Sequence, residues 1–506
     1  IKEYFGTGDP EIPGLLKWGA RSADLGGALG VSLISRAVRH NLKELARQFI
    51  VGETMDDVLK NIARLRTEGF AFVLDILGEA TVSEDEADRY LMGYLQLLDN
   101  LGKGQASWTP MRGRSGDTAL DWGYSPRVSI SVKPSSFYSQ VRPVDFGGSV
   151  SAILDRMRVI YKKVIDIGGS LCIDMESYQY KDITLELFRR LRQEYPEYPH
   201  LGVALQSYLR DTDKDLDDLL GWVKDHQFPI SVRLVKGAYW DYETVKARQN
   251  GWVPPVYTMK AESDAAFERQ ALKIFENCNY VYLACASHNV RSIFAVMETA
   301  KELGVPEHCY EFQVLYGMAE PIRKGLLDIT GRVRLYCPYG EMVPGMGYLV
   351  RRLLENTANE CFLRQTFAER VDIERTLEDP EEIVMRARAA KPSRGEKRGP
   401  ESWTALPFTN EPGADFTKKE QREAFLSAIA EVRKSLGKTY PLFINGVDVE
   451  TKGRITSINP ANPSEVIGHV CASGNHQVIA AIDAAKAAFP AWRELSPVAR
   501  SEYLIK

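Results

Sequence analysis

The stretch Ser231–Asp241 reads SVRLVKGAYWD and combines the pattern of a buried strand with that of a binding turn. Apolar residues flank Arg233, and Lys236 and Gly237 follow at the point where the strand would end. In a barrel of alternating strands and helices, that end of a strand faces the active site. Two cations and a glycine that lets the backbone approach closely suit an anionic ligand such as a phosphate. A buried strand followed by a glycine turn with one solvated lysine fits the stretch equally well.

The same strand pattern recurs along the chain and decides the fold class. Short apolar runs predict eight strands, at Phe70–Leu77, Val128–Val132, Leu171–Met175, Gly202–Gln206, Ser231–Val235, Val281–Ala286, Tyr310–Leu315 and Val333–Cys337. Apolar residues at helical spacing lie between most of them, as in the series Ile153, Met157, Ile160 and Val164. Strands that alternate with helices pair in parallel, so eight such units predict an α/β fold with a (β/α)8 barrel.

Length and local composition predict how the chain divides into domains. A chain of 506 residues is too long for one ordinary core, so we expect two or more domains. The predicted segments are an N-terminal helical arm at 1–64, the barrel at 65–370 with a helical insert at about 80–126, a charged linker with helices at 371–436, and the start of a second α/β domain at 437–506. We expect this second domain to be cut off at Lys506, before its active site.

The composition argues against several functional classes. With 44% hydrophobic and 26% charged residues, the chain has the make-up of a soluble globular protein, and its net charge of -4 gives no reason to propose nucleic-acid binding. The seven cysteines are scattered without a CxxC pair, which predicts a reducing compartment without a disulfide framework or a thiolate metal site. The sequence contains no long apolar segment and opens without a secretory signal, so we expect a cytoplasmic location.

Polar residues occupy the ends of the predicted strands. In chain order they are Asp75, Glu79, Lys133, Asp174, Glu176, Gln206, Arg233, Lys236, His288, Asn289, Gln313, Tyr336 and Tyr339. Because the chemistry of such a barrel sits where its strands finish, we expect these side chains to converge at one mouth.

Three of these residues have a structural explanation beside the functional one. Asp174 lies in an otherwise apolar strand, where an unpaired carboxylate would be costly, so it needs a cation partner. Lys133 on the neighbouring strand is a candidate, although a structural ion pair or a surface lysine would also fit. His288, in the sequence ASHN, is either a core histidine bonded to the backbone or a ligand-binding residue at a strand end.

Two adjacent arginines follow the last predicted strand. Arg351 and Arg352 lie on a helix predicted over Tyr348–Phe367, and Glu355 is within one helical turn of both. The pair could clamp a carboxylate while Glu355 orients it, or form a solvated face; the apolar residues around the arginines favour the clamp. These residues indicate an anionic ligand and a carboxylate substrate, and they do not name the redox chemistry.

Four motifs, VRLVKGAYWD, ASHN, EFQVLYGM and YLVRRLLEN, then identify a family. With these motifs in this order, the chain resembles the proline dehydrogenase half of the bifunctional proline utilization A flavoenzymes over about residues 65–370. Leu442–Lys506 resembles the opening of an aldehyde dehydrogenase domain, through FINGV, NPANPSEVIG and the helix that contains AAFPAW. A proline dehydrogenase followed by that opening is the bifunctional arrangement.

The resemblance implies an activity, cofactors and partners. It implies bound FAD, oxidation of L-proline to Δ1-pyrroline-5-carboxylate, and electron transfer to a quinone through transient contact at the inner face of the membrane. It implies NAD as the cofactor of the second domain, which would oxidise glutamate semialdehyde to glutamate. A homo-oligomer is expected, and no nucleic-acid-binding segment is visible at the front of the chain.

The resemblance also implies roles for individual residues. The proline carboxylate would be held by Lys133, Arg351 and Arg352. The catalytic residues would be Asp174, Arg233 and Tyr336, with Tyr336 against the proline ring and Arg233 beside flavin N5. The cofactor-binding residues would be Met175, Gln206, Arg233, Lys236, Gly237, Ala238, Tyr239, Trp240, Ser287, His288, Asn289, Gln313 and Glu355. Ser287 stands where the family has a threonine, and it keeps the hydroxyl.

Two other functions fit a barrel of this kind. One is a flavin reductase that draws on NAD(P)H, in which NADPH and not proline would bleach the flavin. The other is a non-catalytic regulator built on the same barrel, in which replacing Arg352 would cost no turnover.

Overall fold

The computed structural model describes most of the chain. The described residues are 48–111, 120–341, 345, 347–349, 351–352, 377–390 and 410–505. Glu355, most of the arm predicted at 1–64 and most of the helix predicted over Tyr348–Phe367 lie outside these ranges. The chain divides into two compact units, Ile1–Thr417 and Lys418–Lys506.

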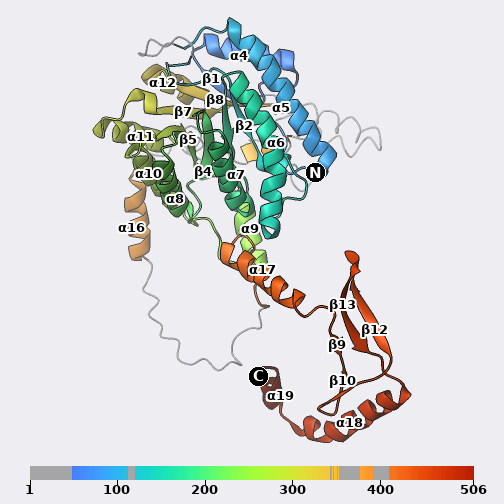
Figure 1. Cartoon of the computed structure of the whole chain (residues 1–506). Helices are drawn as coiled ribbons and strands as arrows, with labels where there is room; N and C mark the ends of the chain where they lie inside the picture. Colours follow the sequence, from blue (N-terminus) through green and yellow to red (C-terminus); the bar gives the residue numbers. More distant parts are fainter. Residues whose placement is uncertain are drawn as a thin grey trace, which may run out of the picture. The chain divides into compact units, whose positions relative to one another are not determined.

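Eight parallel strands of the first unit close into a barrel in chain order (Figure 1). They are β1 (Ala71–Ile76), β2 (Ser129–Val132), β3 (Ser170–Ile173), β4 (Leu201–Gln206), β5 (Ile230–Val235), β6 (Val281–Ala286), β7 (Tyr310–Leu315) and β8 (Val333–Tyr339). Each strand pairs with its neighbours in the chain, and β8 closes the barrel by pairing with β1. The predicted (β/α)8 barrel is therefore confirmed, with strand ends shifted by only one or two residues.

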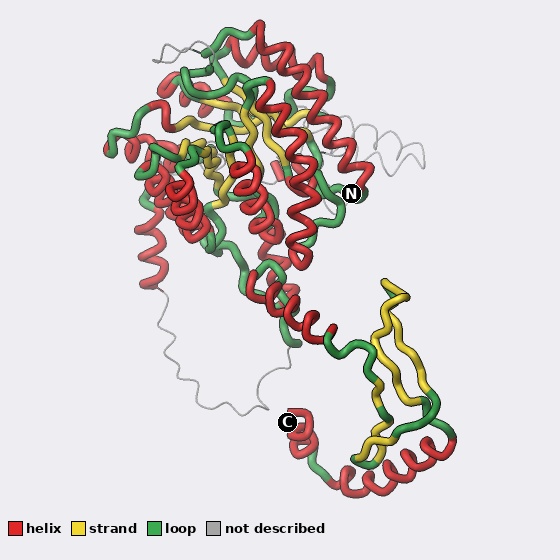
Figure 2. The backbone as a smooth tube through the Cα atoms, viewed as in Figure 1, coloured by secondary structure: helices red, strands yellow, loops and turns green. Residues whose placement is uncertain are grey.

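Helices surround the strands, as Figure 2 shows for the first unit. They are α4 (Met55–Thr67), α5 (Glu84–Gly104), α6 (Phe146–Asp166), α7 (Lys181–Glu194), α8 (Thr212–His226), α9 (Trp240–Asn250), α10 (Lys260–Phe275), α11 (Val290–Glu302), α12 (Glu320–Thr330) and α16 (Pro380–Ala390). Short 3-10 turns lie at Gln105–Ser107, Pro134–Ser136, Pro143–Asp145, Tyr178–Tyr180 and Glu307–Cys309. α5 lies in the predicted helical insert, and the Ser83 side chain caps its acidic first turn by accepting from the N–H of Glu86.

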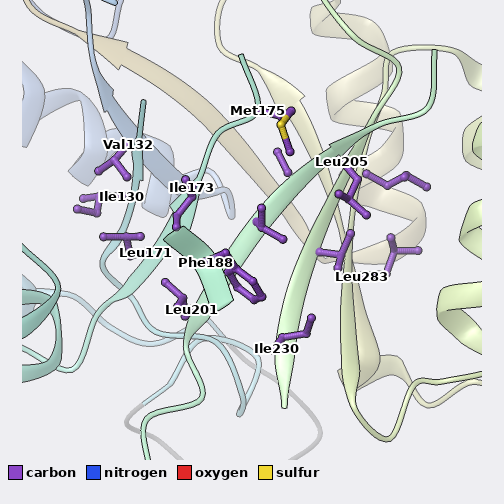
Figure 3. Packing of buried hydrophobic residues seen from close by; sticks show 14 of the residues in the cluster. Ile130, Val132, Leu171, Ile173, Met175, Phe188, Leu201, Leu205, Ile230 and Leu283 are labelled. Atoms are coloured by element: carbon purple, nitrogen blue, oxygen red, sulfur yellow. The ribbon is translucent and has the colours of Figure 1, made fainter. Parts of the chain in front are cut away.

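An apolar layer between strands and helices forms the core. Side chains alternate between the two faces of a strand, so every second residue points outward to the helices. Figure 3 shows part of this layer, in which Ile130 and Val132 of β2 stand in register with Leu171 and Ile173 of β3, near Phe188 of α7. All five side chains are buried. This outward face holds the barrel together and leaves the inward face for other side chains.

The segment before α4 joins the barrel at the carboxyl end of its strands. The backbone N–H of Val51 donates to the carbonyl of Pro338, and Gly52 forms a parallel bridge with Tyr339 of β8. Phe49 packs with Leu349 in a small buried cluster. The cluster therefore ties the start of the described chain to the residues that carry Arg351 and Arg352.

The second unit is a small assembly of strands and helices. It contains α17 (Lys419–Arg433), β9 (Thr439–Tyr440), β10 (Leu442–Ile444), β11 (Val447–Val449), β12 (Arg454–Asn459), β13 (Asn462–Cys471), α18 (Asn475–Glu494) and α19 (Pro497–Ile505). The sheet order is β12-β13-β9, with β10 and β11 as a separate antiparallel pair. In the described part of both units, no helix has the length and apolarity that crossing a membrane requires.

Candidate active site

A cavity of about 520 Å³ lies at the carboxyl end of the barrel strands. Its volume is typical of sites for cofactors and small molecules. Its wall includes every described residue that was assigned to the substrate, the catalysis or the cofactor, namely Lys133, Asp174, Met175, Gln206, Arg233, Lys236, Gly237, Ala238, Tyr239, Trp240, Ser287, His288, Asn289, Gln313, Tyr336, Arg351 and Arg352. Of the other polar residues expected at the mouth, Glu176 lines the cavity, whereas Asp75, Glu79 and Tyr339 do not. Glu355 lies outside the described residues.

The guanidinium of Arg233 crosses the barrel interior. Nη1 donates to Asp174 Oδ1 at 2.5 Å and to Ser131 Oγ at 2.7 Å, and Nε donates to Gln313 Oε1 at 2.8 Å. Arg233 belongs to β5, which pairs with β4 and β6, whereas its partners belong to β2, β7 and the end of β3. Such contacts are possible only across the interior, so Arg233 forms the floor of the cavity.

Small neighbours leave room for this guanidinium. The residues in register with Arg233 on β4 and β6 are Ala204 and Ala284. On the far side, the Tyr336 ring lies 5.2 Å from the Arg233 guanidinium carbon, and its hydroxyl donates to Asp174 Oδ2 at 2.7 Å. The three predicted catalytic residues therefore form one hydrogen-bonded cluster.

The predicted pairing of Asp174 with Lys133 is only partly right. The closest cation to Asp174 is Arg233, whereas Lys133 Nζ lies 3.8 Å from Asp174 Oδ2 and contacts the carboxylate of Asp75 directly. Arg233 is the closer cation because its side chain reaches Asp174 across the barrel interior. The order of the strands in the sequence does not reveal such a contact. Burial raises the pKa of Asp75 to about 6, against the opposing effect of Lys133.

Asp75 also contributes to the charge of Lys133. Burial by itself would lower the pKa of the Lys133 ammonium, but the carboxylates of Asp75 and Asp174 outweigh it and raise the pKa. Lys133 is therefore a buried cation, not the surface lysine that the sequence left open. The side chain of Asp75 is a site residue to which the sequence assigned no role; its signal was an acid inside the apolar run FAFVLDIL.

The two arginines after β8 lie at the cavity and do not form a solvated face. The side chain of Arg351 is 20% exposed, and Arg352 is 8% exposed. Arg351 donates to both oxygens of Glu79, at 2.6 and 2.9 Å, and the Tyr239 hydroxyl donates to Glu79 at 3.0 Å. Burial of Glu79 opposes ionisation, but these bonds lower its pKa overall. Within the described residues, the carboxylate that orients Arg351 is therefore Glu79.

Gln206 on β4 lines the cavity and carries a buried acceptor without a protein donor. Gln206 Nε2 donates to the carbonyls of Met175 and Glu176, at 3.1 and 3.2 Å. Gln206 Oε1 is buried and has no hydrogen-bond partner among the described residues. A buried acceptor without a donor is costly, so a ligand that supplies an N–H is the expected partner.

Past the end of β5, Lys236 and Gly237 form the turn that the sequence indicated. Lys236 Nζ contacts the carboxylate of Asp264 and donates to Ser292 Oγ at 3.0 Å, so it is not a solvated lysine. Burial lowers the pKa of this ammonium. Gly237 has a φ of 124°, and a Cβ there would lie 2.3 Å from the ring of Tyr208. Both the backbone angle and the space therefore require glycine.

The end of β6 places a helix amino terminus at the cavity. Ser287 Oγ accepts from the N–H of Asn289 at 3.1 Å, and Asn289 caps α11 by accepting from the N–H of Ser292. His288 Nε2 accepts from the N–H of Leu315 at 3.1 Å, so a neutral ring carries its proton on Nδ1. His288 is thus bonded to backbone and also lines the cavity, which joins the two explanations that its sequence context allowed.

Glu176 is a further cavity residue without a predicted role. It is buried and accepts from the N–H and the hydroxyl of Ser135, at 2.9 and 2.5 Å. Burial raises its pKa to about 7. The acid pair in the sequence CIDMES was its signal, but the sequence does not show which of the two acids meets a cation.

These groups fit a flavin dinucleotide better than a metal ion. Among the described residues, no cluster of three or more histidine, cysteine or acidic side chains could hold a metal. The unpaired oxygen of Gln206 suits the ring N–H of a flavin, and Arg233 supplies a cation in the wall of the same cavity. Lys236 and the amino terminus of α11 suit phosphates.

Comparison with known proteins matches both units. Residues 58–365 match the proline dehydrogenase family, and residues 447–506 match the aldehyde dehydrogenase family. The chain is 35% identical over 317 residues to proline dehydrogenase 2 of Bacillus subtilis, covering 63% of this chain and 88% of that protein. It is 27% identical over 499 residues to the bifunctional protein PutA of Escherichia coli, covering 94% of this chain and 36% of that protein.

A solved structure agrees with these matches. Proline utilization A from Bdellovibrio bacteriovorus, inactivated by N-propargylglycine, superimposes with a TM-score of 0.81 and 38% sequence identity. The match covers 92% of this chain and 47% of that one. The chain thus spans less than half the length of the bifunctional proteins that it resembles. A proline dehydrogenase barrel followed by the opening of an aldehyde dehydrogenase domain is the order seen here, and the chain belongs to the proline dehydrogenase family, within the bifunctional PutA group.

Proposed function

We propose that this protein oxidises L-proline to Δ1-pyrroline-5-carboxylate with bound FAD and passes the electrons to a membrane quinone. The observation that supports this most directly is one cavity whose wall carries both cations suited to a carboxylate and groups suited to a flavin dinucleotide. The family match and the names of the relatives favour proline over other small carboxylates as the substrate.

The substrate end of the proposed site lies near β1, β2 and β8. Lys133 follows β2, and Arg351 and Arg352 follow β8, with β1 between those two strands in the sheet. These cations would hold the carboxylate of proline through charge-assisted hydrogen bonds. The ring of Tyr336 would pack against the substrate ring. Holding both ends of so small a molecule would fix the pose from which a hydride leaves C5.

The cofactor end is built by β4, β5 and β6. Bound FAD would supply the hydride acceptor. Gln206 would accept a hydrogen bond from the ring edge, and Lys236 with the start of α11 would hold the pyrophosphate. Arg233 would lie against the ring. Because Asp174 and Gln313 already hold its guanidinium, Arg233 would favour negative charge beside it without rearranging.

For the whole protein we propose a second activity, the NAD-dependent oxidation of glutamate semialdehyde to glutamate. Support comes from the match of residues 447–506 to the aldehyde dehydrogenase family and from the bifunctional relatives. The NAD site and the catalytic cysteine would belong to parts of that domain beyond the matched segment. Homo-oligomer formation and transient contact with the membrane surface complete the proposal.

The visible spectrum of the purified protein tests the proposed function. We expect a flavin absorption band that fades when L-proline is added without oxygen. A parallel sample receives NADPH, which should leave the band unchanged. A colourless protein, or a flavin that NADPH bleaches and proline does not, would contradict the proposal.

Replacing one arginine tests the substrate end separately. We expect Arg352→Ala to raise the KM for proline by about 10- to 100-fold, because a lost hydrogen bond to a charged group costs about 1.5–3 kcal/mol. Flavin content should stay at the wild-type level. Arg190→Ala, at a partly exposed position on α7, is the matched control and should leave KM unchanged. Equal KM values for wild type and both variants would show that Arg352 does not bind the carboxylate of proline.

A further inference from the structure

Below the floor of the active-site cavity, the barrel interior holds a second group of polar side chains. Glu311 and Arg334 lie there, each 2% exposed, beside a separate cavity of about 380 Å³ lined by residues from the starts of the strands. Glu311 does not line the active-site cavity, and neither the family match nor the proposed chemistry gives it a role. Gln313, two residues further along β7, lines both cavities.

We infer that Glu311 is a positioning residue that fixes the Arg233 guanidinium by holding the side-chain amide of Gln313 in one orientation. The inference rests on the proposed function, in which Arg233 lies against the flavin. Glu311 and Gln313 are two residues apart on one strand, so both side chains point into the interior. The path from Glu311 to Arg233 therefore needs only one intervening side chain.

The hydrogen bonds of Glu311 fix the position of its carboxylate. Its Oε1 accepts from Gln313 Nε2 at 2.6 Å and from Arg334 Nε at 2.7 Å. Its Oε2 accepts from Arg334 Nη2 and from the Tyr282 hydroxyl, both at 3.0 Å. An ionised carboxylate can only accept hydrogen bonds, so the group that Gln313 turns toward it must be the NH2.

The orientation of Gln313 in turn decides what Arg233 meets. With its NH2 on Glu311, Gln313 presents Oε1 to Arg233 Nε, at 2.8 Å. A flipped amide would present an NH2 to the same N–H, which places two donors against each other. Arg233 would then have to leave the position that its bonds to Asp174 and Ser131 define. Glu311 thus decides the direction of the hydrogen bonds that lead through Gln313 to Arg233 at the active site.

Removing both oxygens should free the amide of Gln313. In Glu311→Met, the NH2 of Gln313 loses its acceptor, so the amide that presents Oε1 to Arg233 is no longer anchored. Glutamine would not test this, because an amide oxygen in the place of Oε1 would still accept from both Gln313 and Arg334.

The test uses the purified holoenzyme and the reduction equilibrium of its bound flavin, measured by anaerobic titration against a reference dye. For Glu311→Met we expect the equilibrium to shift by tenfold or more, which is about 30 mV for a two-electron couple. With proline, kcat should fall by about tenfold while KM stays within about threefold, because the carboxylate contacts are unchanged.

Tyr282→Phe is the matched control. It removes a bond to the same carboxylate, but on Oε2, which does not face Gln313. We expect its flavin equilibrium and kcat to stay within about twofold of wild type, since Gln313 keeps its acceptor. A purely structural role for Glu311 would instead make the two variants differ only in stability.

The double variant Glu311→Met with Arg334→Met covers the case in which the single variant does not fold. Replacing a buried ion pair by apolar side chains of similar size often leaves stability unchanged or raises it. The double variant should fold and still show the shifted flavin equilibrium, because Gln313 has lost its fixed acceptor. If only the double variant folds, its flavin reduction equilibrium tests the inference by itself.

The outcomes separate this inference from the proposed function. A wild-type protein without a proline-reducible flavin overturns the proposed function and the inference with it. A working wild type with an unshifted Glu311→Met overturns the inference alone, as does an equal shift in Tyr282→Phe or a wild-type equilibrium in the double variant. A shift confined to the two Glu311 variants supports it.

Discussion

The outward and inward faces of the barrel strands have opposite chemistry. On β5, Val232 and Leu234 point outward and are fully buried among apolar side chains, whereas Arg233 between them points inward to acids and amides. Barrels of this type usually fill their interior with branched apolar side chains. Here the outward face holds the fold together, and the inward face carries paired charges whose burial opposes stability. One strand therefore serves two purposes through alternate residues.

The largest effect should come from the inward residue. We expect Arg233→Met to lower kcat/KM for proline by a thousandfold or more, about 4 kcal/mol of transition-state stabilisation. The side chain is apolar and of similar length, so the loss would come from charge and hydrogen bonding. Steady-state kinetics with an artificial electron acceptor measure it. Activity within tenfold of wild type would mean that the inward face is not the reactive one.

The outward neighbour should affect stability and not chemistry. Leu234→Ala removes a fully buried side chain next to Arg233 and should lower the free energy of unfolding by about 3 kcal/mol. Urea unfolding of the barrel checks this value. Below the unfolding transition, kcat per bound flavin should equal that of wild type. A change in kcat without a change in stability would mean that the outward face also takes part in the chemistry.

The outward face was the part that the sequence predicted well. Apolar runs such as FAFVLDIL record burial directly, because residues on both sides of such a strand must avoid water. All eight strands and the barrel could therefore be predicted without knowing any contact. Their ends moved by a residue or two because backbone pairing, and not side-chain type, decides where a strand stops.

For the inward face, the sequence predicted which residues line the cavity but not which of them contact each other. Polar residues at strand ends identified the cavity wall, including Lys133 and Arg233. The predicted ion pair of Asp174 with Lys133 is present, but the closer contact of Asp174 with Arg233 was not predicted. Contacts across the interior join strands that are neighbours neither in sequence nor in the sheet, so no local pattern records them. Glu79, which holds Arg351, was predicted at the mouth without a named partner, and Glu311 was not predicted as a site residue.

Burying polar groups on the inward face costs stability. Because one of these groups is an acid, Glu176, the free energy of unfolding should depend on pH. Burial raises the pKa of Glu176 from 4.5 to about 7, so the folded protein keeps this proton over a range in which the unfolded chain has lost it. The stability contributed by the proton is therefore lost as pH rises through that range. Between pH 5 and pH 8 the loss should be about 2 kcal/mol, at 1.36 kcal/mol per unit of pKa.

Glu176→Gln removes this proton and keeps the shape of the side chain. The amide can accept from the N–H of Ser135 and donate to its hydroxyl, so the local bonds are retained. We expect the variant to lose about 2 kcal/mol less stability than wild type from pH 5 to pH 8. Glu298→Gln on the exposed face of α11 is the control and should follow wild type. Parallel pH profiles for all three proteins would show that burial of Glu176 carries no cost.

The smallest effect should come from the edge of the inward face, where β6 meets α11. Ser287 Oγ accepts from the N–H of Asn289, which caps the helix that would face the pyrophosphate of FAD. Ser287→Ala leaves that N–H without its acceptor, at a cost of about 1 kcal/mol, or about fivefold in the Kd for FAD. Ser287→Thr keeps the hydroxyl and should bind FAD as wild type does. Titration of the apoprotein with FAD distinguishes the two, and equal Kd values for alanine and threonine would show that the hydroxyl does not shape this end of the site.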